Sequence, residues 1–208
     1  MSGRRGAPAG TGDASAAGNL RSGDPTNGCF VALDFETADH GRDSACALGL
    51  VKVSPGRPVE RLYHLIRPPR PRILFTWVHG IAWAHVADQP TFAERWPEVE
   101  GFLAGADFLV AHNAPFDRGV LQACCQAAGV APPAVPFFCS VQLSRRTWNL
   151  TSASLPTVCQ FLGFSLQHHH AAADAEACAM IVLAAAKERG ALGLPWQPLK
   201  PPRPTAHP

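Results

Sequence analysis

Long apolar runs are missing from this sequence of 208 residues. No stretch approaches the roughly 18 consecutive apolar residues that a membrane-spanning helix needs. The first 26 residues also lack the apolar core of a signal peptide, because they are mostly small and polar. We therefore expect a cytoplasmic protein without a membrane partner.

Cysteine pairs of the Cys-x-x-Cys type are missing as well. The seven cysteines are scattered and odd in number, which argues against a zinc ribbon and against a framework of disulfides. The sequence therefore predicts reduced thiols, as expected for the cytoplasm.

Lysine is scarce, since only three of the 18 basic residues are lysines and the other fifteen are arginines. The formal net charge of +2 is too small for a general binder of polyanions. The planar guanidinium of arginine suits phosphate groups. A genomic bias toward arginine, alanine, glycine and proline is the simpler explanation for most of these arginines.

The composition predicts one domain with two tails. Nearly half of the residues are apolar, which is enough for a core, and the length is that of a single domain. Residues 1–26 are rich in glycine, alanine, serine and threonine, which predicts a disordered N-terminal tail. Residues 27–190 form the predicted domain, and residues 191–208 form a proline-rich C-terminal tail.

Apolar periodicity and turn signals predict the order of the elements. Strands are expected at 29–35, 45–53, 59–67, 107–111 and 135–141, and helices at 92–103, 115–129, 155–162 and 171–189. Thr91 is a suitable N-cap, Pro115 suits a first helical turn, and Gly129 suits a helix end. The first three strands form a meander and αβ units follow, so the sequence predicts an α/β fold with a mixed five-stranded sheet flanked by helices.

Two carboxylates follow the apolar run of the first strand. Asp34 and Glu36 are two residues apart, so both side chains point to the same face of the strand. Two buried carboxylates at this distance repel each other, which favours a divalent metal ion between them. In the alternative interpretation, the strand ends in a polar loop and both carboxylates lie in water.

Two further acidic residues are placed where they can join this pair. Asp117 lies at the start of the helix that follows the fourth strand, and Asp174 lies in an alanine-rich helix, where an unpaired buried carboxylate would be costly. His169 precedes Asp174 by five residues. The first and fourth strands should be neighbours, and their carboxyl ends form the usual ligand site of such folds.

These residues belong to three ordered motifs. Residues 34–37 read D-F-E-T, residues 112–117 read H-N-A-P-F-D, and residues 169–175 read H-H-A-A-A-D-A. Together with residues 76–81 (T-W-V-H-G-I), they resemble the motifs of the DEDD exonucleases. The chain is similar to their DnaQ-like DEDDh branch, which includes the proofreading epsilon subunit of bacterial DNA polymerase III. The resemblance covers about residues 28–190 and implies a ribonuclease H-like fold.

The resemblance also implies an activity and the residues that carry it. It implies a 3′-to-5′ exonuclease of replication or repair that hydrolyses phosphodiester bonds of single-stranded DNA and releases 5′-mononucleotides. Two Mg²⁺ or Mn²⁺ ions would supply the attacking hydroxide and stabilise the leaving oxygen. Asp34 would bridge both ions, Glu36 and Asp174 would complete the first site, and Asp117 would hold the second. His169 would be the general base.

Residues 168–170 are three consecutive histidines, so the general base has to be assigned to one of them. The histidine branch of the family places its base five residues before the last aspartate, which is His169 here. The tyrosine branch uses a tyrosine four residues before it, where this chain has His170. We interpret His168 and His170 as flanking loop residues. In the alternative interpretation, the three histidines form an adventitious metal-binding patch.

The resemblance implies further contacts with the substrate. Thr37 is expected near the terminal 3′-hydroxyl, and Phe35 and His79 are expected to pack against the last nucleotides. Phe116 either stacks on a base or is a buried aromatic residue. His112 and Asn113 either orient Asp117 or cap its helix. The residues expected to contact the substrate are thus Phe35, Thr37, His79, His112, Asn113 and Phe116.

Some features depart from the family pattern or leave alternatives open. Ala38 and Asp39 replace the common Thr-Gly after D-x-E-T, which alters the loop near the nucleotide. Arg145 and Arg146 either contact the nucleic-acid backbone or form a solvated pair. The alternatives to a DNA exonuclease are an exoribonuclease that trims RNA and an accessory subunit of a polymerase. Residues 196–199 are either a docking peptide for such a replication partner or, more simply, part of a spacer.

Overall fold

The computed structural model describes residues 28–165, 168–190 and 197–200. The predicted N-terminal tail lies outside these residues, as does most of the predicted C-terminal tail. Within the described ranges, no helix combines the length and the apolar character that crossing a membrane requires. All seven cysteines lie in the described part of the chain and are free thiols in this structure.

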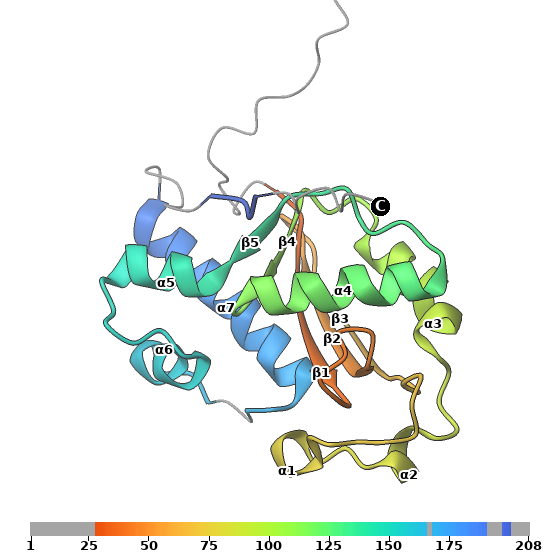
Figure 1. Cartoon of the computed structure of the whole chain (residues 1–208). Helices are drawn as coiled ribbons and strands as arrows, with labels where there is room; N and C mark the ends of the chain where they lie inside the picture. The colour runs from red at the N-terminus through yellow and green to blue at the C-terminus, as the bar shows by residue number, and fades with distance from the viewer. Residues whose placement is uncertain (1–27, 166–167, 191–196, 201–208) are drawn as a thin grey trace, which may run out of the picture.

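The centre of the fold is one five-stranded sheet with the order β3-β2-β1-β4-β5 (Figure 1). Its strands are β1 (Phe30–Thr37), β2 (Ala45–Val53), β3 (Glu60–Leu65), β4 (Phe108–Ala111) and β5 (Phe137–Cys139). β1, β2 and β3 form the predicted antiparallel meander, whereas β4 pairs parallel to both β1 and β5. The predicted mixed five-stranded sheet is therefore confirmed.

Seven helices connect or cover the strands in the described ranges. They are α1 (Thr76–His79), α2 (Trp83–Val86), α3 (Phe92–Leu103), α4 (Ala114–Ala128), α5 (Ser140–Trp148), α6 (Leu155–Leu162) and α7 (Ala171–Arg189). Two predicted capping residues have the expected geometry. The Thr91 side chain accepts a hydrogen bond from the Glu94 backbone N–H at the start of α3. Gly129 ends α4 in a left-handed conformation with φ of 69°.

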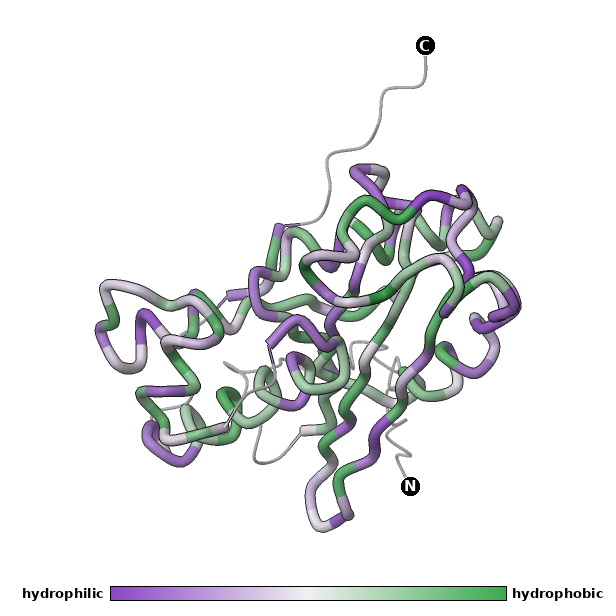
Figure 2. The backbone as a smooth tube through the Cα atoms, turned by 90° about the horizontal axis from the view of Figure 1, so that it is seen from below, coloured by the Kyte–Doolittle hydropathy of each residue, from purple (hydrophilic) through white to green (hydrophobic). Residues whose placement is uncertain are grey.

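The central strand β1 contributes side chains to two separate cores. Val31, Leu33 and Phe35 pack with α3 and α4, whereas Phe30 and Ala32 pack with α7 on the other face of the sheet (Figure 1). Figure 2 shows green hydrophobic segments that recur along the strands, interrupted by purple hydrophilic ones. Because side chains alternate along a strand, Asp34 and Glu36 lie on the α7 face.

The prediction was wrong for the segment after β4. A strand was expected at 135–141, but β5 covers only Phe137–Cys139, and α5 begins at Ser140. The apolar residues around β5 favour a strand locally. Leu143 of α5, however, is buried against α7. Tertiary packing therefore decides where the strand ends and the helix begins. Residues 76–79 and 83–86, where no helix was predicted, form the short helices α1 and α2.

Gly49 lets the start of α7 approach the sheet. Gly49 pairs with Asp34 in the register of β1 and β2. A Cβ atom at Gly49 would lie 2.2 Å from the Ala171 carbonyl oxygen and 2.4 Å from its carbonyl carbon. Ala171 begins the helical turn that carries Asp174. The absence of a side chain at Gly49 therefore sets the distance between the strand carboxylates and Asp174.

We expect the substitution Gly49→Ala to displace the first turn of α7. The added methyl group meets backbone rather than a flexible side chain, and overpacking of this kind costs roughly 1–3 kcal/mol. Thermal unfolding should show this loss, and isothermal titration should show weakened binding of Mg²⁺. Gly101→Ala is the matched control, since a Cβ atom at this position in α3 meets nothing within 4 Å and alanine favours a helix. Equal stability of both variants would contradict the prediction.

Candidate active site

Three carboxylates from distant parts of the sequence meet at one end of β1. Asp34 and Glu36 extend from β1, and Asp174 extends from the first turn of α7. One carboxylate oxygen of each residue lies within 4.8 Å of those of the other two. Glu36 is buried and Asp174 is only 4% exposed. The structure therefore brings together three of the four predicted acidic residues and excludes the interpretation in which the strand carboxylates simply lie in water.

Burial and mutual repulsion raise the pKa values of these carboxyl groups. The pKa of Asp34 lies well above its usual value, because the group is buried and because Asp117, Asp174 and Glu36 are close. Burial, and then Asp174, raise the pKa of Glu36 to about 7. The pKa of Asp174 is also raised by burial, although the neighbouring histidines oppose this. Such a cluster favours a bound cation that offsets its negative charge.

The donor set fits a hard divalent metal ion. The Asp174 Oδ1 atom is buried and has no hydrogen-bond partner among the described residues, and an unpaired buried oxygen of this kind is costly. The three possible ligands of this cluster are carboxylates, which suit Mg²⁺ or Mn²⁺ better than zinc. Asp34, Glu36 and Asp174 therefore form a chemically suitable site for one such ion.

Asp117 lies beside the cluster but is engaged differently. Its side chain is 1% exposed in the first turn of α4, and its Oδ1 atom accepts a hydrogen bond of 3.1 Å from the Phe35 backbone N–H. Burial raises the pKa of Asp117 to about 8. Its carboxylate does not belong to the group of three whose oxygens lie within 4.8 Å of one another. Its predicted role at a second ion therefore stays a prediction.

Two of the three consecutive histidines lie against Asp174. The His168 Nδ1 atom is 3.0 Å from Asp174 Oδ2, and the His169 backbone N–H donates to the same oxygen over 3.1 Å. The His168 and His169 rings stack with a centroid distance of 3.8 Å, whereas His170 stacks on Tyr63. His168, expected as a flanking loop residue, is thus the histidine whose ring contacts Asp174.

His79 fixes the end of β1 from the short helix α1. Its Nε2 atom lies 3.2 Å from the Thr37 carbonyl oxygen, and its Nδ1 atom accepts a hydrogen bond of 3.0 Å from the Ile81 backbone N–H. Nε2 therefore donates to Thr37, and burial lowers the pKa of His79. The ring is half-buried, so in this structure its polar atoms position Thr37.

His112 connects the end of β4 to two later segments. Its Nδ1 atom is 2.8 Å from Ser140 Oγ, and its Nε2 atom is 2.9 Å from the Ala153 carbonyl oxygen. Burial lowers the pKa of His112 to about 4, so the imidazole is neutral at pH 7. The following residue, Asn113, is the N-cap position of α4 with φ of 70°, but its side chain makes no capping hydrogen bond.

The two predicted aromatic contacts have different surroundings. Phe35 is 3% exposed and packs in the core on the α4 face, because its side chain points away from Asp34 and Glu36. This position differs from the expected contact with a nucleotide. Phe116 is 38% exposed, and the Arg42 guanidinium lies 5.9 Å from its ring centroid. The interpretation of Phe116 as a fully buried aromatic residue is therefore wrong.

The loop after Thr37 is held by Arg70, which lies in an arginine- and proline-rich segment at residues 67–72, before α1. The Arg70 guanidinium donates to Asp39 over 2.7 Å and to Asp43 over 2.6 Å. This ion pair lowers the pKa values of both carboxyl groups. Ala38, which departs from the family pattern, is fully buried. The altered residues thus build a loop that Arg70 holds in place.

A cavity of about 560 Å³ opens beside the carboxylates. It is lined by Asp34, His112, Asn113, Val141, Arg145, His168, Asp174 and residues 151–156. Arg145 extends from α5 and is exposed, and no acidic group among the described residues pairs with it. The serine- and threonine-rich segment 151–154 was missed by the sequence analysis, since it carries no periodic pattern or motif that was used there.

We expect the metal-free protein to lose stability as the pH rises from about 4.5 to about 7. The folded-state pKa of Glu36 lies above its unfolded value of 4.5, so the folded state binds more protons in this window and the free energy of unfolding falls with pH. The contribution of Glu36 should end above its raised pKa, and its size is at most on the order of 3 kcal/mol. The raised pKa values of Asp34 and Asp117 extend the loss of stability to higher pH, whereas the lowered pKa of His112 opposes it at the acidic end.

Thermal unfolding in EDTA between pH 4.5 and 8 tests this expectation. The Tm should fall by several degrees, and Mg²⁺ at pH 8 should restore it because the ion binds only the folded state. Glu36→Gln should flatten the profile. A Tm that rises with pH in the wild-type protein would contradict the prediction.

Comparisons with known proteins agree with this geometry. The RNase T exonuclease family model matches residues 31–182. A PolC-type DNA polymerase III from Thermotoga petrophila is 31% identical over 161 residues, which are 76% of this chain and 12% of that protein. The chain thus spans about an eighth of that relative's length. Exodeoxyribonuclease 10 from Escherichia coli is 36% identical over 101 residues, which are 47% of this chain and 39% of the relative.

A solved structure shows the same fold. The structure of exonuclease X in complex with 5′-overhanging duplex DNA superposes with a TM-score of 0.60 and 26% sequence identity. The match covers 77% of this chain and 92% of that one. Together with the family match, this likeness confirms the predicted ribonuclease H-like exonuclease fold.

Proposed function

Because the chain belongs to the exonuclease family, we propose that it is a metal-dependent enzyme that removes nucleotides from the 3′ end of single-stranded DNA. The observation that carries this proposal is the buried cluster of Asp34, Glu36 and Asp174, whose oxygens lie within 4.8 Å of one another. DNA is favoured because the relatives are a DNA polymerase and an exodeoxyribonuclease, and because exonuclease X is solved with DNA.

The acidic residues would hold two Mg²⁺ or Mn²⁺ ions. Asp34 would be shared by both ions, Glu36 and Asp174 would complete the first site, and Asp117 would serve the second. When bound, such ions activate a water molecule and neutralise the charge that develops on the leaving oxygen. The unpartnered Asp174 Oδ1 atom supports the first of these sites.

The remaining residues would orient the reaction and move its proton. His169 would take the proton of the attacking water, and its backbone N–H already orients Asp174. Thr37, held by His79, would contact the terminal 3′-hydroxyl. Trp77 on α1 is 83% exposed and offers a sequence-tolerant surface on which bases of a single strand can stack.

Arg145 is expected to bind a backbone phosphate of the substrate. It lines the cavity beside the carboxylates without an acidic partner in the described ranges. Arg145→Ala should raise the KM for a single-stranded oligonucleotide about fivefold with little change in kcat. The binding constant of the substrate, taken as 1/KM, should also depend less steeply on salt. The slope of its logarithm against the logarithm of the salt concentration should shrink in magnitude by about 0.7, the value for one phosphate contact to a single strand. Steady-state kinetics at several salt concentrations give both quantities.

Arg57→Ala is the matched control for Arg145. Arg57 is an exposed arginine in the turn between β2 and β3, at the end of the sheet away from the carboxylates. Its loss should leave KM and the salt slope unchanged. The role of Arg145 would be refuted if both variants had the same effect.

Cleavage of a 5′-labelled single-stranded DNA oligonucleotide in Mg²⁺, Mn²⁺ or EDTA tests the proposed function. We expect a metal-dependent ladder that shortens from the 3′ end and releases 5′-mononucleotides. A matched RNA oligonucleotide runs in parallel, and faster cleavage of RNA would assign the chain to the alternative class that trims RNA. No cleavage of either polymer would favour the accessory-subunit alternative.

A further inference from the structure

A short C-terminal segment returns to the sheet at its β5 edge. The Leu199 backbone N–H donates to the Phe137 carbonyl oxygen over 2.7 Å, and Arg118 Nη1 donates to the Lys200 carbonyl oxygen over 2.6 Å. The Leu199 side chain packs against the core between the sheet and α4. Residues 197–200, which we name the C-terminal strap, therefore bind through both backbone and side chain.

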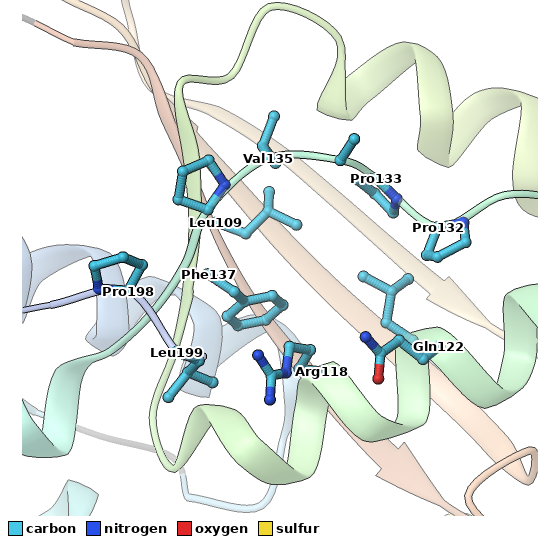
Figure 3. Close-up of a pocket in the computed structure, with 12 residues that line it drawn as sticks. Leu109, Arg118, Gln122, Pro132, Pro133, Val135, Phe137, Pro198 and Leu199 are labelled. Carbon is cyan, nitrogen blue, oxygen red and sulfur yellow. The ribbon is translucent and has the colours of Figure 1, made fainter. Parts of the chain in front are cut away.

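The strap covers only one end of a larger groove. A hollow of about 430 Å³ lies beside Pro198 and Leu199. Figure 3 shows Val135, Pro133 and Pro132 along one side, and Arg118 and Gln122 of α4 along the other. The groove is mainly apolar, with a few polar groups on the helix that can meet a peptide backbone.

The groove is remote from the catalytic cluster. Leu109 and Phe137, which line it, lie at the beginning of β4 and β5. Asp34 and Glu36 lie in the second half of β1, which runs parallel to β4. The groove and the carboxylates thus lie at opposite ends of the parallel strands, so a peptide in the groove does not obstruct the cavity beside the carboxylates.

We infer that this groove is a binding site for an extended peptide that contains a proline–leucine pair. The strap fills one end of the groove within the chain, and a partner protein with the same pair can take the place of the strap. β5 is an edge strand, and edge strands bind added strands through backbone hydrogen bonds while side-chain pockets give specificity. The strap shows both elements, namely the bond to Phe137 and the Leu199 side chain in the core.

The chemistry of the bound segment defines the partner. Pro198 lacks a backbone N–H, and the adjacent Leu199 N–H makes the bond to β5. Arg118 then binds the carbonyl group one residue further on. A competing segment needs an aliphatic side chain after a proline and a free carbonyl group at the next residue. A tethered strap has an effective concentration in the millimolar range, so a free peptide competes well only when the strap is weakened.

Fluorescence anisotropy with a labelled peptide of residues 197–208 tests the inference on the full chain. We expect weak binding to the wild-type chain and at least about tenfold tighter binding to Leu199→Asp, in which the strap no longer fills its pocket. Adding Val135→Asp to this variant should abolish binding, because Val135 lines the groove. A probe peptide with aspartate in place of its leucine should not bind. Leu199→Ala, as a milder variant, should give an intermediate affinity.

Two outcomes would overturn the inference. One is the absence of peptide binding to both Leu199→Asp and Leu199→Ala, provided that thermal unfolding shows that each variant is folded. The other is a wild-type dimer that Leu199→Asp converts into a monomer, since the strap would then belong to a second copy. Exonuclease activity of Leu199→Asp should equal that of the wild-type chain, so this test is independent of the proposed function.

Discussion

We expect Asp34→Asn to nearly abolish cleavage of single-stranded DNA and at the same time to stabilise the metal-free protein. Asparagine keeps the size of the side chain but removes the negative charge that two ions would share. Loss of a residue that only supports a metal ligand typically costs 10–100-fold, so the loss of the shared ligand should exceed about 10²-fold in kcat. The same substitution removes a carboxyl group whose pKa is raised by burial and then by repulsion from Asp117, Asp174 and Glu36.

Two measurements on one preparation separate this outcome from misfolding. Single-turnover cleavage in Mg²⁺ should fall to the background, while the Tm in EDTA at pH 8 should rise above that of the wild-type chain. Asp88→Asn is the matched control, because Asp88 is exposed and forms no ion pair within the described residues. It should change neither quantity. Retained cleavage in Asp34→Asn would refute the assignment of the metal site.

We expect His169→Ala to lower kcat by roughly 10²–10⁴-fold, the usual contribution of a general base. The motif assigns the base to His169, yet the ring that contacts Asp174 is that of His168. His169 also adopts a left-handed backbone conformation with φ of 64°, which alanine tolerates poorly. Asparagine tolerates this conformation better, so His169→Asn should show the same loss of kcat with less disturbance of the loop.

His168→Ala is the comparison that decides between the two histidines. Its loss removes a hydrogen bond to Asp174 but leaves the proposed base in place, so kcat should fall less than in His169→Asn. Mg²⁺ binding, measured by the rise in Tm, should change more in His168→Ala than in His169→Asn. A larger loss of kcat in His168→Ala would transfer the role of the base to His168.

The sheet and most of its helices could be predicted because their signals are local. Apolar alternation, prolines and glycines fixed the order of the strands and the ends of α3 and α4. The boundary between β5 and α5 could not be predicted, because the residues around it favour a strand locally while Leu143 is buried against another helix. The environment of Phe35 could not be predicted either. Its side chain lies in the core because α3 and α4 cover that face of β1.

The chemistry of the site was determined by the sequence itself. The spacing of Asp34 and Glu36 places both carboxylates on one face of any strand, and the three motifs identify the family. Only the tertiary structure decided how near Asp174 comes to them, since this distance depends on Gly49 and on the packing of α7 against β2. It also decided that the ring of His168 reaches Asp174 and that Leu199 reaches β5, because the path of each loop depends on the packing of the elements around it.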